Sequence, residues 1–449
     1  MIEKYYSGVI EQIYNRIGKE TRNIVMANYS NDFSIENLEV IRRYQSNEDN
    51  VFFAYSEFSY NTLVGAYEPF LDIICNMHRR FIGGSFDDFQ KECGVYYLHR
   101  QVLNSYYETG ECFREETVLL NEVAYEQRRM TMAIADMLKR LSEVRPLMIV
   151  INRFQMASKS SIETIKYLID NPCANIGIVL GVNAIVKGAD STVEVWDRIV
   201  ESLEDRSAIY YIGSAGPLKN NIKTTNDDEL YITMNFEQSI QEASNIMEFL
   251  DYEQARRGCR IIEHKIKFEN AWIDEKSLRR FYLVYARTSV LLGEMSKAIE
   301  LMNEYKALIP ENDSEHYFSL YYFMKGTCYM YQGKLEKAEG CAKKAYDYAL
   351  LADDELLEFK SELLSVMIKM SGWYNIFFCV QDIPVSDEII EKLIKHGYRN
   401  HLAHIYIYAY DNSRDVVKQS FYDESLLKHF TKGLELAKEI GNEQLVYDA

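Results

Sequence analysis

A pattern of small residues repeats in the C-terminal half of the chain and restricts that half to stacked helices. Helical segments end at Gly293 and Gly333, and an alanine follows each glycine at the same distance, at Ala298 and Ala338. The two copies lie about 40 residues apart, and Ala255 marks a weaker earlier copy. Glycine lets a helix end in a tight turn, and alanine lets the next helix approach closely. Such a chain buries its apolar faces by stacking helix pairs on one another.

The N-terminal half follows a different pattern, in which apolar runs of strand length alternate with helix-like segments. The runs are residues 24–29, 51–56, 147–151, 176–181 and 208–213. This alternation predicts a parallel sheet with helices on both faces. Residues 1–21 pattern as an amphipathic helix that packs on this domain. The sequence therefore predicts an α/β domain over residues 22–235 and an all-α superhelix over residues 236–449.

The first apolar run and the helix-like run after it have the layout of a phosphate-binding loop without the residues that bind phosphate. Aligned on G-x-x-x-x-G-K-[ST], the chain has Ala27, Asp32, Phe33 and Ser34. Both glycines and the lysine are absent, and a carboxylate stands where a triphosphate would bind. Only Ser34, the Mg²⁺ ligand of such loops, remains. A chance match of an ordinary strand, loop and helix is the alternative explanation.

The run at residues 147–151 ends where a Walker B motif places the aspartate that holds Mg²⁺. Asn152 occupies this position, and Arg153 follows it. A neutral amide is a poor ligand for a hard cation, and the arginine replaces a catalytic acid by a cation. Two losses in the expected order favour one eroded nucleotide site. We therefore expect no cofactor, no metal and no enzymatic activity.

Several segments near these positions resemble the NTPase module of signalling ATPases that carry a C-terminal helical-repeat sensor. They are Glu68-Pro-Phe, the run RPLMIVINRFQMAS with the helix after it, and the run NIGIVLG. That family includes STAND-type, AAA-like ATPases, large LuxR-type regulators, and bacterial proteins whose tetratricopeptide-like repeats precede a diguanylate cyclase. The resemblance extends from about residue 20 to the end of the chain. It implies a degenerate P-loop domain, a tetratricopeptide-like superhelix, and a downstream output domain such as a diguanylate cyclase.

Charge and the absence of targeting signals limit the partners and the compartment. Lysine and arginine number 50 against 68 acidic residues, and the formal net charge is −18. Such a charge repels a phosphate backbone, so nucleic acid is not an expected partner. The N-terminus lacks the features of a secretory signal, and no apolar run is long enough to span a bilayer. We expect a cytoplasmic protein without a membrane partner. The last repeat is incomplete in its pattern, as expected for the N-terminal part of a longer protein or an amputated relative of one.

Two local patterns give further expectations. Residues 115–141 keep a helical period of apolar side chains, which predicts one long helix. His401 and His404 would share a helical face, as metal ligands do, but no third ligand has suitable spacing. The many tyrosines of the repeats either interlock helix pairs or line a concave groove for a ligand.

These observations favour a non-catalytic sensory or scaffolding module of a bacterial signalling or regulatory protein. The helical repeats would bind a protein, a peptide or a small effector. One alternative is an ATP-binding switch that holds phosphate through Ser34 and the backbone amides of a helix N-terminus. Another alternative is an assembly protein whose oligomerisation is the function.

Overall fold

The computed structural model describes residues 2–29, 38–46, 50–59, 63–118, 120–183, 193–212, 235–268, 273–312, 314–375, 386–409 and 424–448. Contacts divide the chain into two compact units. The sheet unit comprises Met1–Val95, Val102–Phe113 and Val123–Ala271. The helical unit comprises Tyr96–Gln101, Arg114–Glu122 and Trp272–Ala449.

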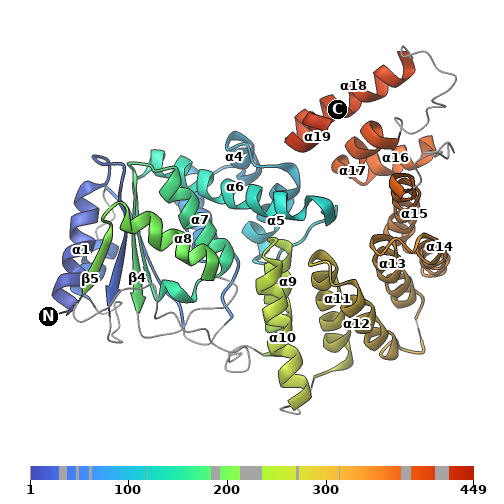
Figure 1. The fold of residues 1–449 in the computed structure, drawn as a ribbon, viewed down its shortest axis with the longest axis horizontal. Helices are drawn as coiled ribbons and strands as arrows, with labels where there is room; N and C mark the ends of the chain where they lie inside the picture. Colours follow the sequence, from blue (N-terminus) through green and yellow to red (C-terminus); the bar gives the residue numbers. More distant parts are fainter. Residues whose placement is uncertain are drawn as a thin grey trace. The chain divides into compact units, whose positions relative to one another are not determined.

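The sheet unit is built around five parallel strands (Figure 1). They are β1 (Ile24–Tyr29), β2 (Phe52–Glu57), β3 (Leu147–Asn152), β4 (Ile176–Asn183) and β5 (Ile209–Ile212). Their order is β2-β3-β4-β1-β5, so β4 and β1 are interior and β2 lies at an edge. All residues of β3 and β4 are buried, as expected for parallel strands with helices on both faces. The predicted parallel sheet is confirmed.

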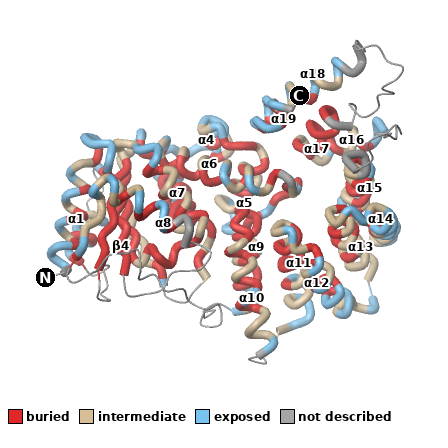
Figure 2. The backbone as a smooth tube through the Cα atoms, viewed as in Figure 1, coloured by how far each residue is buried: buried red, intermediate tan, exposed pale blue. Residues whose placement is uncertain are grey.

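Helices cover the sheet on its two sides. α1 (Ile2–Arg16) places Ile10 and Ile13 in a core cluster with β1, β3 and β4, and α2 (Glu39–Ser46) adds Ile41 to the same cluster. α7 (Lys159–Asp170) and α8 (Val193–Glu204) lie on the side opposite α1 in Figure 1. β1, β3 and β4, which lie between these helices, consist almost wholly of buried residues (Figure 2).

The remaining helices of the sheet unit come from two stretches of chain. Between β2 and β3 lie α3 (Phe70–Met77), the π-helix η1 (His78–Ile82), α4 (Phe86–Glu92), most of α5 (Tyr97–Thr109) and α6 (Val123–Val144). The 3-10 turn η3 (Phe154–Met156) follows β3, and α9 (Phe236–Glu248) and α10 (Tyr252–Phe268) complete the unit. The sequence places the start of the superhelix at residue 236, whereas contacts group α9 and α10 with the sheet.

The helix predicted over residues 115–141 is wrong at its start. α6 begins at Val123, and the described residues of Arg114–Glu122 contain only the 3-10 turn η2 (Leu120–Glu122). This stretch belongs to the helical unit. The apolar period of the sequence is compatible with a helix here, but tertiary contacts of two glutamates hold the chain in another conformation.

The described residues of the helical unit form helices and turns without a strand. The helices are α11 (Glu275–Leu291), α12 (Met295–Ala307), α13 (Glu315–Tyr331), α14 (Leu335–Leu351), α15 (Glu355–Asn375), α16 (Asp387–Lys395), α17 (Arg399–His404), the π-helix η7 (Ile405–Ala409), α18 (Glu424–Ile440) and α19 (Glu443–Asp448). α13 packs on α14, and α14 packs on α15. The C-terminal region is thus largely helical, and its tetratricopeptide character stays a prediction.

One turn recurs between the helices of this unit. After α11, Gly293 has a φ of 77°, and its N–H donates to the carbonyl of Val290. After α13, Gly333 has a φ of 70°, and its N–H donates to the carbonyl of Met330. The positive φ explains the glycines, since other residues reach it only with strain. Ala298 and Ala338, which follow in the next helices, are fully buried. None of the helices in the described part of the chain has the length and apolar character that crossing a membrane requires.

Candidate functional site

The carboxyl ends of the parallel strands are the place where a P-loop protein would bind nucleotide. Ala27 lies inside β1, fully buried and paired with Gly181 and Tyr210 of the neighbouring strands. Asp32, Phe33 and Ser34 lie outside the described residues. Of the aligned positions, Ala27 is thus part of the sheet.

Asn152 ends β3 and uses its oxygen within the fold. The Tyr29 hydroxyl donates to Asn152 Oδ1 at 2.5 Å, and the backbone N–H of Arg153 donates to the same oxygen at 3.0 Å. A Cβ added at Gly181 would lie 2.9 Å from this oxygen and would collide with the Tyr6 hydroxyl. The side-chain oxygen at the Walker B position is thus enclosed by protein groups.

Arg153 also has protein partners. Its φ of 55° places it in the left-handed region, and its Nη1 lies 3.1 Å from Glu57 Oε1 at the end of β2. The arginine and the glutamate are both mostly buried, with side chains 19% and 18% exposed. A cation bound in this way ties the ends of β2 and β3 together, which is a structural role for the residue.

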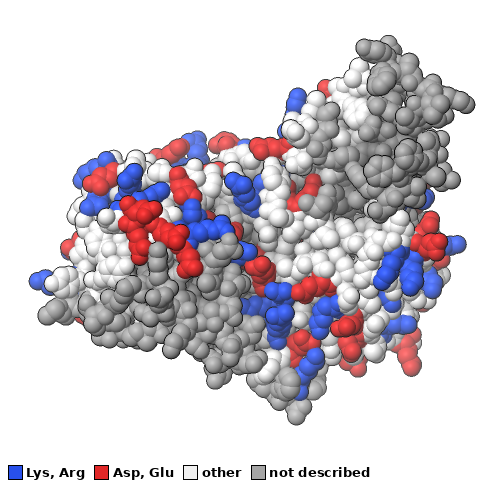
Figure 3. Space-filling view, viewed as in Figure 1, with Lys and Arg blue, Asp and Glu red and all other residues white. Residues whose placement is uncertain are grey.

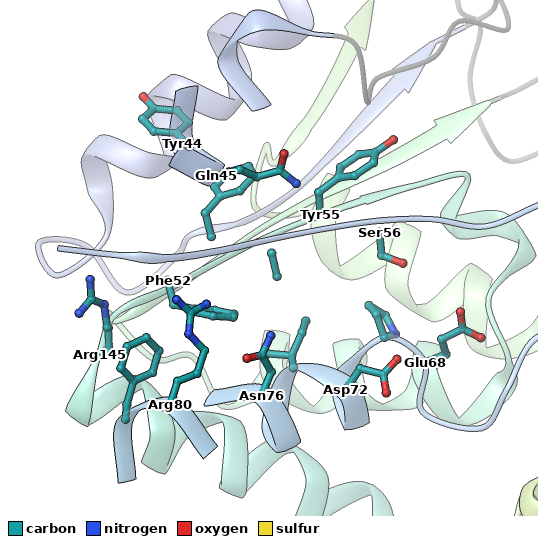
Figure 4. Close-up of a pocket in the computed structure, with 15 residues that line it drawn as sticks. Tyr44, Gln45, Phe52, Tyr55, Ser56, Glu68, Asp72, Asn76, Arg80 and Arg145 are labelled. Carbon is teal, nitrogen blue, oxygen red and sulfur yellow. The ribbon is translucent and has the colours of Figure 1, made fainter. Parts of the chain in front are cut away.

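A groove of about 350 Å³ lies beside β2 (Figure 4). We call it the β2 groove. Residues 52–56 of β2 form its floor, α2 contributes Tyr44 and Gln45, and α3 contributes Asp72 and Asn76. Arg80 and Arg145 lie at the end near Phe52, whereas Glu68 and Asp72 lie at the end near Ser56 (Figure 4). The groove therefore has a basic end and an acidic end.

The acidic end continues into a group of three carboxyls, of which Glu68 and Glu242 are half-buried and Asp72 is exposed. The Gly65 N–H donates to Glu68 Oε2 at 3.0 Å, and the Tyr106 hydroxyl donates to Asp72 Oδ1 at 2.9 Å. Burial, together with the nearby charges of Glu68 and Asp72, raises the pKa of Glu242 to about 7. Burial also raises the pKa of Glu68, although the Gly65 N–H opposes this effect. Burial and nearby carboxyls of like charge both disfavour the ionised form, which explains why the pKa values of Glu242 and Glu68 are raised.

The helical unit holds a second polar site, formed around residues 114–122. We call this stretch the acidic strap. Arg114, Glu116 and Val118 are buried, whereas Glu115 and Thr117 between them are exposed. Burial with a period of two is what an extended chain shows, because successive side chains point to opposite sides. Residues 114–118 of the strap are therefore extended.

Glu116 anchors one part of the strap and is fully buried. Its Oε2 accepts from the backbone N–H of Asn400 at 3.2 Å, and its Oε1 accepts from the N–H of His401 at 2.6 Å. His401 Nδ1 lies 2.6 Å from the same Oε1. The Tyr398 hydroxyl adds a hydrogen bond of 2.5 Å to the carbonyl of Glu115. The first turn of α17 thus binds both the side chain and the backbone of the strap.

Glu122 anchors the other end of the strap. Its Oε1 lies 2.8 Å from His404 Nε2, and Asn400 Nδ2 donates to its Oε2 at 3.2 Å. Asn442, before α19, donates to Oε1 at 3.4 Å and to Asn400 Oδ1 at 2.8 Å. Burial raises the pKa of Glu122, but hydrogen bonds from His404, Asn442 and Asn400 outweigh it, so the pKa lies below the usual value. The ionised carboxylate is the favoured form.

The sequence singled out His401 and His404 as a pair on one helical face. The structure gives each of them a glutamate of the strap as its partner, and no group of residues suited to a metal ion occurs in the described part of the chain. Glu116 and Glu122 were missed by sequence reasoning, because they lie far from both histidines along the chain. The apolar residues around them follow a helical period, which gave no indication that the two glutamates bind the histidines.

No protein-family model matches the chain, and no curated protein is significantly similar to it.

Proposed function

We propose that the protein is a non-catalytic binding module whose helical unit receives an extended acidic segment. The observation that carries this proposal is the acidic strap itself, bound at Glu116 and Glu122 by side chains and backbone of α17 and by Asn442. A partner protein with two glutamates at similar spacing would compete with the strap for these groups. The strap then acts as an internal ligand that is exchanged for an external one.

The chemistry of the site supports a peptide as the ligand. Glu116 alone receives two backbone N–H groups and one imidazole, and the Leu120 backbone N–H donates to the Tyr331 hydroxyl at 3.2 Å. Contacts to both backbone and carboxylate are what peptide recognition needs. On the face shown in Figure 3, basic side chains of the described residues lie among acidic ones, which favours a protein partner over nucleic acid.

The wider role of this module follows from the resemblance of the sequence. We propose a cytoplasmic sensory or scaffolding function in bacterial signalling, with tetratricopeptide-like repeats and a degenerate P-loop domain. An output domain such as a diguanylate cyclase would respond to the exchange of the strap. The internal hydrogen bonds of Asn152 support a sheet unit kept for its structure and without ATP hydrolysis.

The test is a labelled synthetic peptide of residues 114–122, titrated against the full-length protein and followed by fluorescence anisotropy. We expect weak binding to the unmodified chain, whose strap occupies the site. A Glu116→Ala/Glu122→Ala variant releases its own strap and should bind the peptide at least tenfold more tightly, since it loses several hydrogen bonds to two buried carboxylates.

Glu115→Ala is the matched control, because the Glu115 side chain is exposed and only its carbonyl is used. This variant should behave as the unmodified chain does. A doubly substituted protein that keeps its helical circular dichroism but still ignores the peptide would overturn the proposal.

The ATP-binding switch is separated from this proposal by calorimetry. We expect no saturable heat when the protein is titrated with ATP and Mg²⁺ up to millimolar concentration. Saturable binding at micromolar ATP that disappears in Ser34→Ala would establish a nucleotide site and contradict the structural role assigned to Asn152.

A further inference from the structure

β2 combines an edge position with a groove, and this combination is independent of the acidic strap. Among the described strands, β3 is its only neighbour. The N–H of Phe52 donates to the Pro146 carbonyl, and the N–H of Phe58 donates to the Asn152 carbonyl. Because backbone groups alternate along a strand, Phe53 and Glu57 direct their N–H and C=O groups away from β3. Within the described residues no strand pairs with these groups, and an additional strand would pair there.

The basic end of the groove has cations that are held in place by aromatic rings. The Arg145 guanidinium lies 4.8 Å from the centre of the Phe81 ring, and that of Arg80 lies 5.8 Å from the centre of the Phe52 ring. Phe52 and Phe81 themselves meet edge to face at 5.8 Å. Arg145 has no ion pair among the described residues, and its Nε has no hydrogen-bond partner there. This end is preorganised for a carboxylate.

The acidic end is suited to the opposite charge. Glu68 and Asp72 receive one N–H and one hydroxyl, and neither has a cationic partner among the described residues. Glu242 stands behind them and adds a third carboxyl group. A lysine or arginine of a ligand would relieve the repulsion of these groups. A nucleotide or another polyanion that filled the groove would meet unfavourable charge at this end.

We propose that the β2 groove binds an extended peptide segment of a partner protein, which joins the sheet as a strand beside β2. The segment carries an acidic side chain against Arg80 and Arg145 and a basic side chain against Glu68 and Asp72. Five residues of β2 line the groove, and a strand rises about 3.3 Å per residue, so the segment spans about five residues. Backbone pairing provides affinity, and the two charged ends fix direction and register.

The experiment uses labelled five-residue probes and the full-length protein. The probes are acetyl-Glu-Val-Thr-Val-Lys-amide, its reverse acetyl-Lys-Val-Thr-Val-Glu-amide, and the neutral acetyl-Gln-Val-Thr-Val-Gln-amide. We expect at least one charged order to bind at least tenfold more tightly than the neutral probe, because a charged probe can match both ends of the groove in one strand direction. Equal binding of all three probes, or none at millimolar concentration, would overturn the proposal.

Variants at the two ends identify the site. Arg145→Gln, at a half-buried position, should weaken the preferred probe about tenfold, and Asp72→Asn, at an exposed position, should weaken it by a smaller factor. Arg140→Gln is the control, because Arg140 is exposed at the end of α6, where it pairs with Glu143 at the surface. Asp72→Asn can still accept the Tyr106 hydrogen bond, so a folding defect in one variant leaves the other informative. Unchanged affinity in both would place the peptide elsewhere.

Two further measurements test whether the probe pairs with β2 as an added strand. Methylation of the central amide of the preferred probe removes a backbone donor and should abolish binding if that donor pairs with β2. Hydrogen exchange should slow at Phe53 and Glu57 when the unmethylated probe is present. Should methylation of any single amide leave the affinity unchanged, with no added protection in β2, the probe would not be bound as a strand. Self-association of the protein that the probe does not disturb would assign the edge to a second copy instead.

Discussion

The two units place polar groups in the interior in different ways. In the sheet unit, Asn152 and Arg153 pair with Tyr29 and Glu57, which are carried by strands of the same sheet. In the helical unit, buried glutamates of the acidic strap pair with His401 and His404 nearly 300 positions further along the chain, a sequence separation of 285 and 282. The sheet unit pairs residues that lie on strands of one sheet, whereas the helical unit pairs helix residues with a segment outside its helical stack. The second arrangement can be undone without dismantling a secondary structure element.

The largest effect should follow from removal of both strap anchors. Glu116→Ala/Glu122→Ala removes the carboxylates to which His401, His404 and Asn400 are hydrogen-bonded, and each lost hydrogen bond to a charged group costs about 1.5–3 kcal/mol. We expect thermal unfolding of the helical unit at clearly lower temperature and fast hydrogen exchange in residues 114–122. If the sheet unit loses as much protection as the helical unit, the contrast drawn between them is wrong.

Acid should weaken the same contact. The pKa of Glu122 lies below its usual value in the folded protein, so its contribution is present above that usual value and is lost as pH falls through the folded pKa. Exchange of the strap should therefore accelerate below about pH 4, a range in which an unperturbed glutamate titrates. Glu122→Gln should remove this part of the pH dependence.

The next effect lies in the sheet unit and concerns Glu242. There the pH dependence is reversed, because stability is lost as pH rises. The raised pKa of Glu242 means that stability is greatest below the usual glutamate pKa and falls as pH rises to about 7. Glu242→Gln should stabilise the protein at pH 8 by on the order of 2–3 kcal/mol and have little effect at pH 5. Urea unfolding at both pH values measures it. Glu237→Gln, on the exposed first turn of α9, is the control, and an equal gain there would refute the assignment.

The recurring turn should give matched, intermediate losses. Gly293→Ala and Gly333→Ala meet no neighbouring atom within 4 Å but retain φ values of 77° and 70°. Each should therefore cost about 1–2 kcal/mol through backbone strain alone. Gly340→Ala, inside α14 and also without neighbours within 4 Å, should instead stabilise by about 0.5–1 kcal/mol. Denaturant titrations of the three variants compare them, and unequal losses at the two turns would show that the turns are not equivalent.

The smallest effect should come from the sheet pair. Tyr29→Phe removes the hydroxyl that donates to Asn152, but the backbone N–H of Arg153 still donates to the same oxygen. Loss of one donor of two should cost about 1 kcal/mol in urea unfolding. A loss as large as that of the strap variant would mean that the local pairing is as critical as the distant one.

Prediction from the sequence succeeded where short-range pattern decides structure. The five strands were found within two residues of their ends, and the helical character of the C-terminal region was found as well. It failed at residues 115–122, where the apolar period predicted a helix. Val118 and Leu120 fit either conformation, and the choice falls to Glu116 and Glu122, whose partners no local pattern reveals.

The amino-acid sequence by itself determined the parallel sheet and the helical C-terminal region, because these depend on the period of apolar residues and on glycine at turns. Only the tertiary structure decided that Glu116 meets His401 and that Phe52, Arg80 and Asp72 line one groove. Such contacts join residues far apart in the chain, and their free energy arises from burial and exact geometry that spacing along the sequence does not encode.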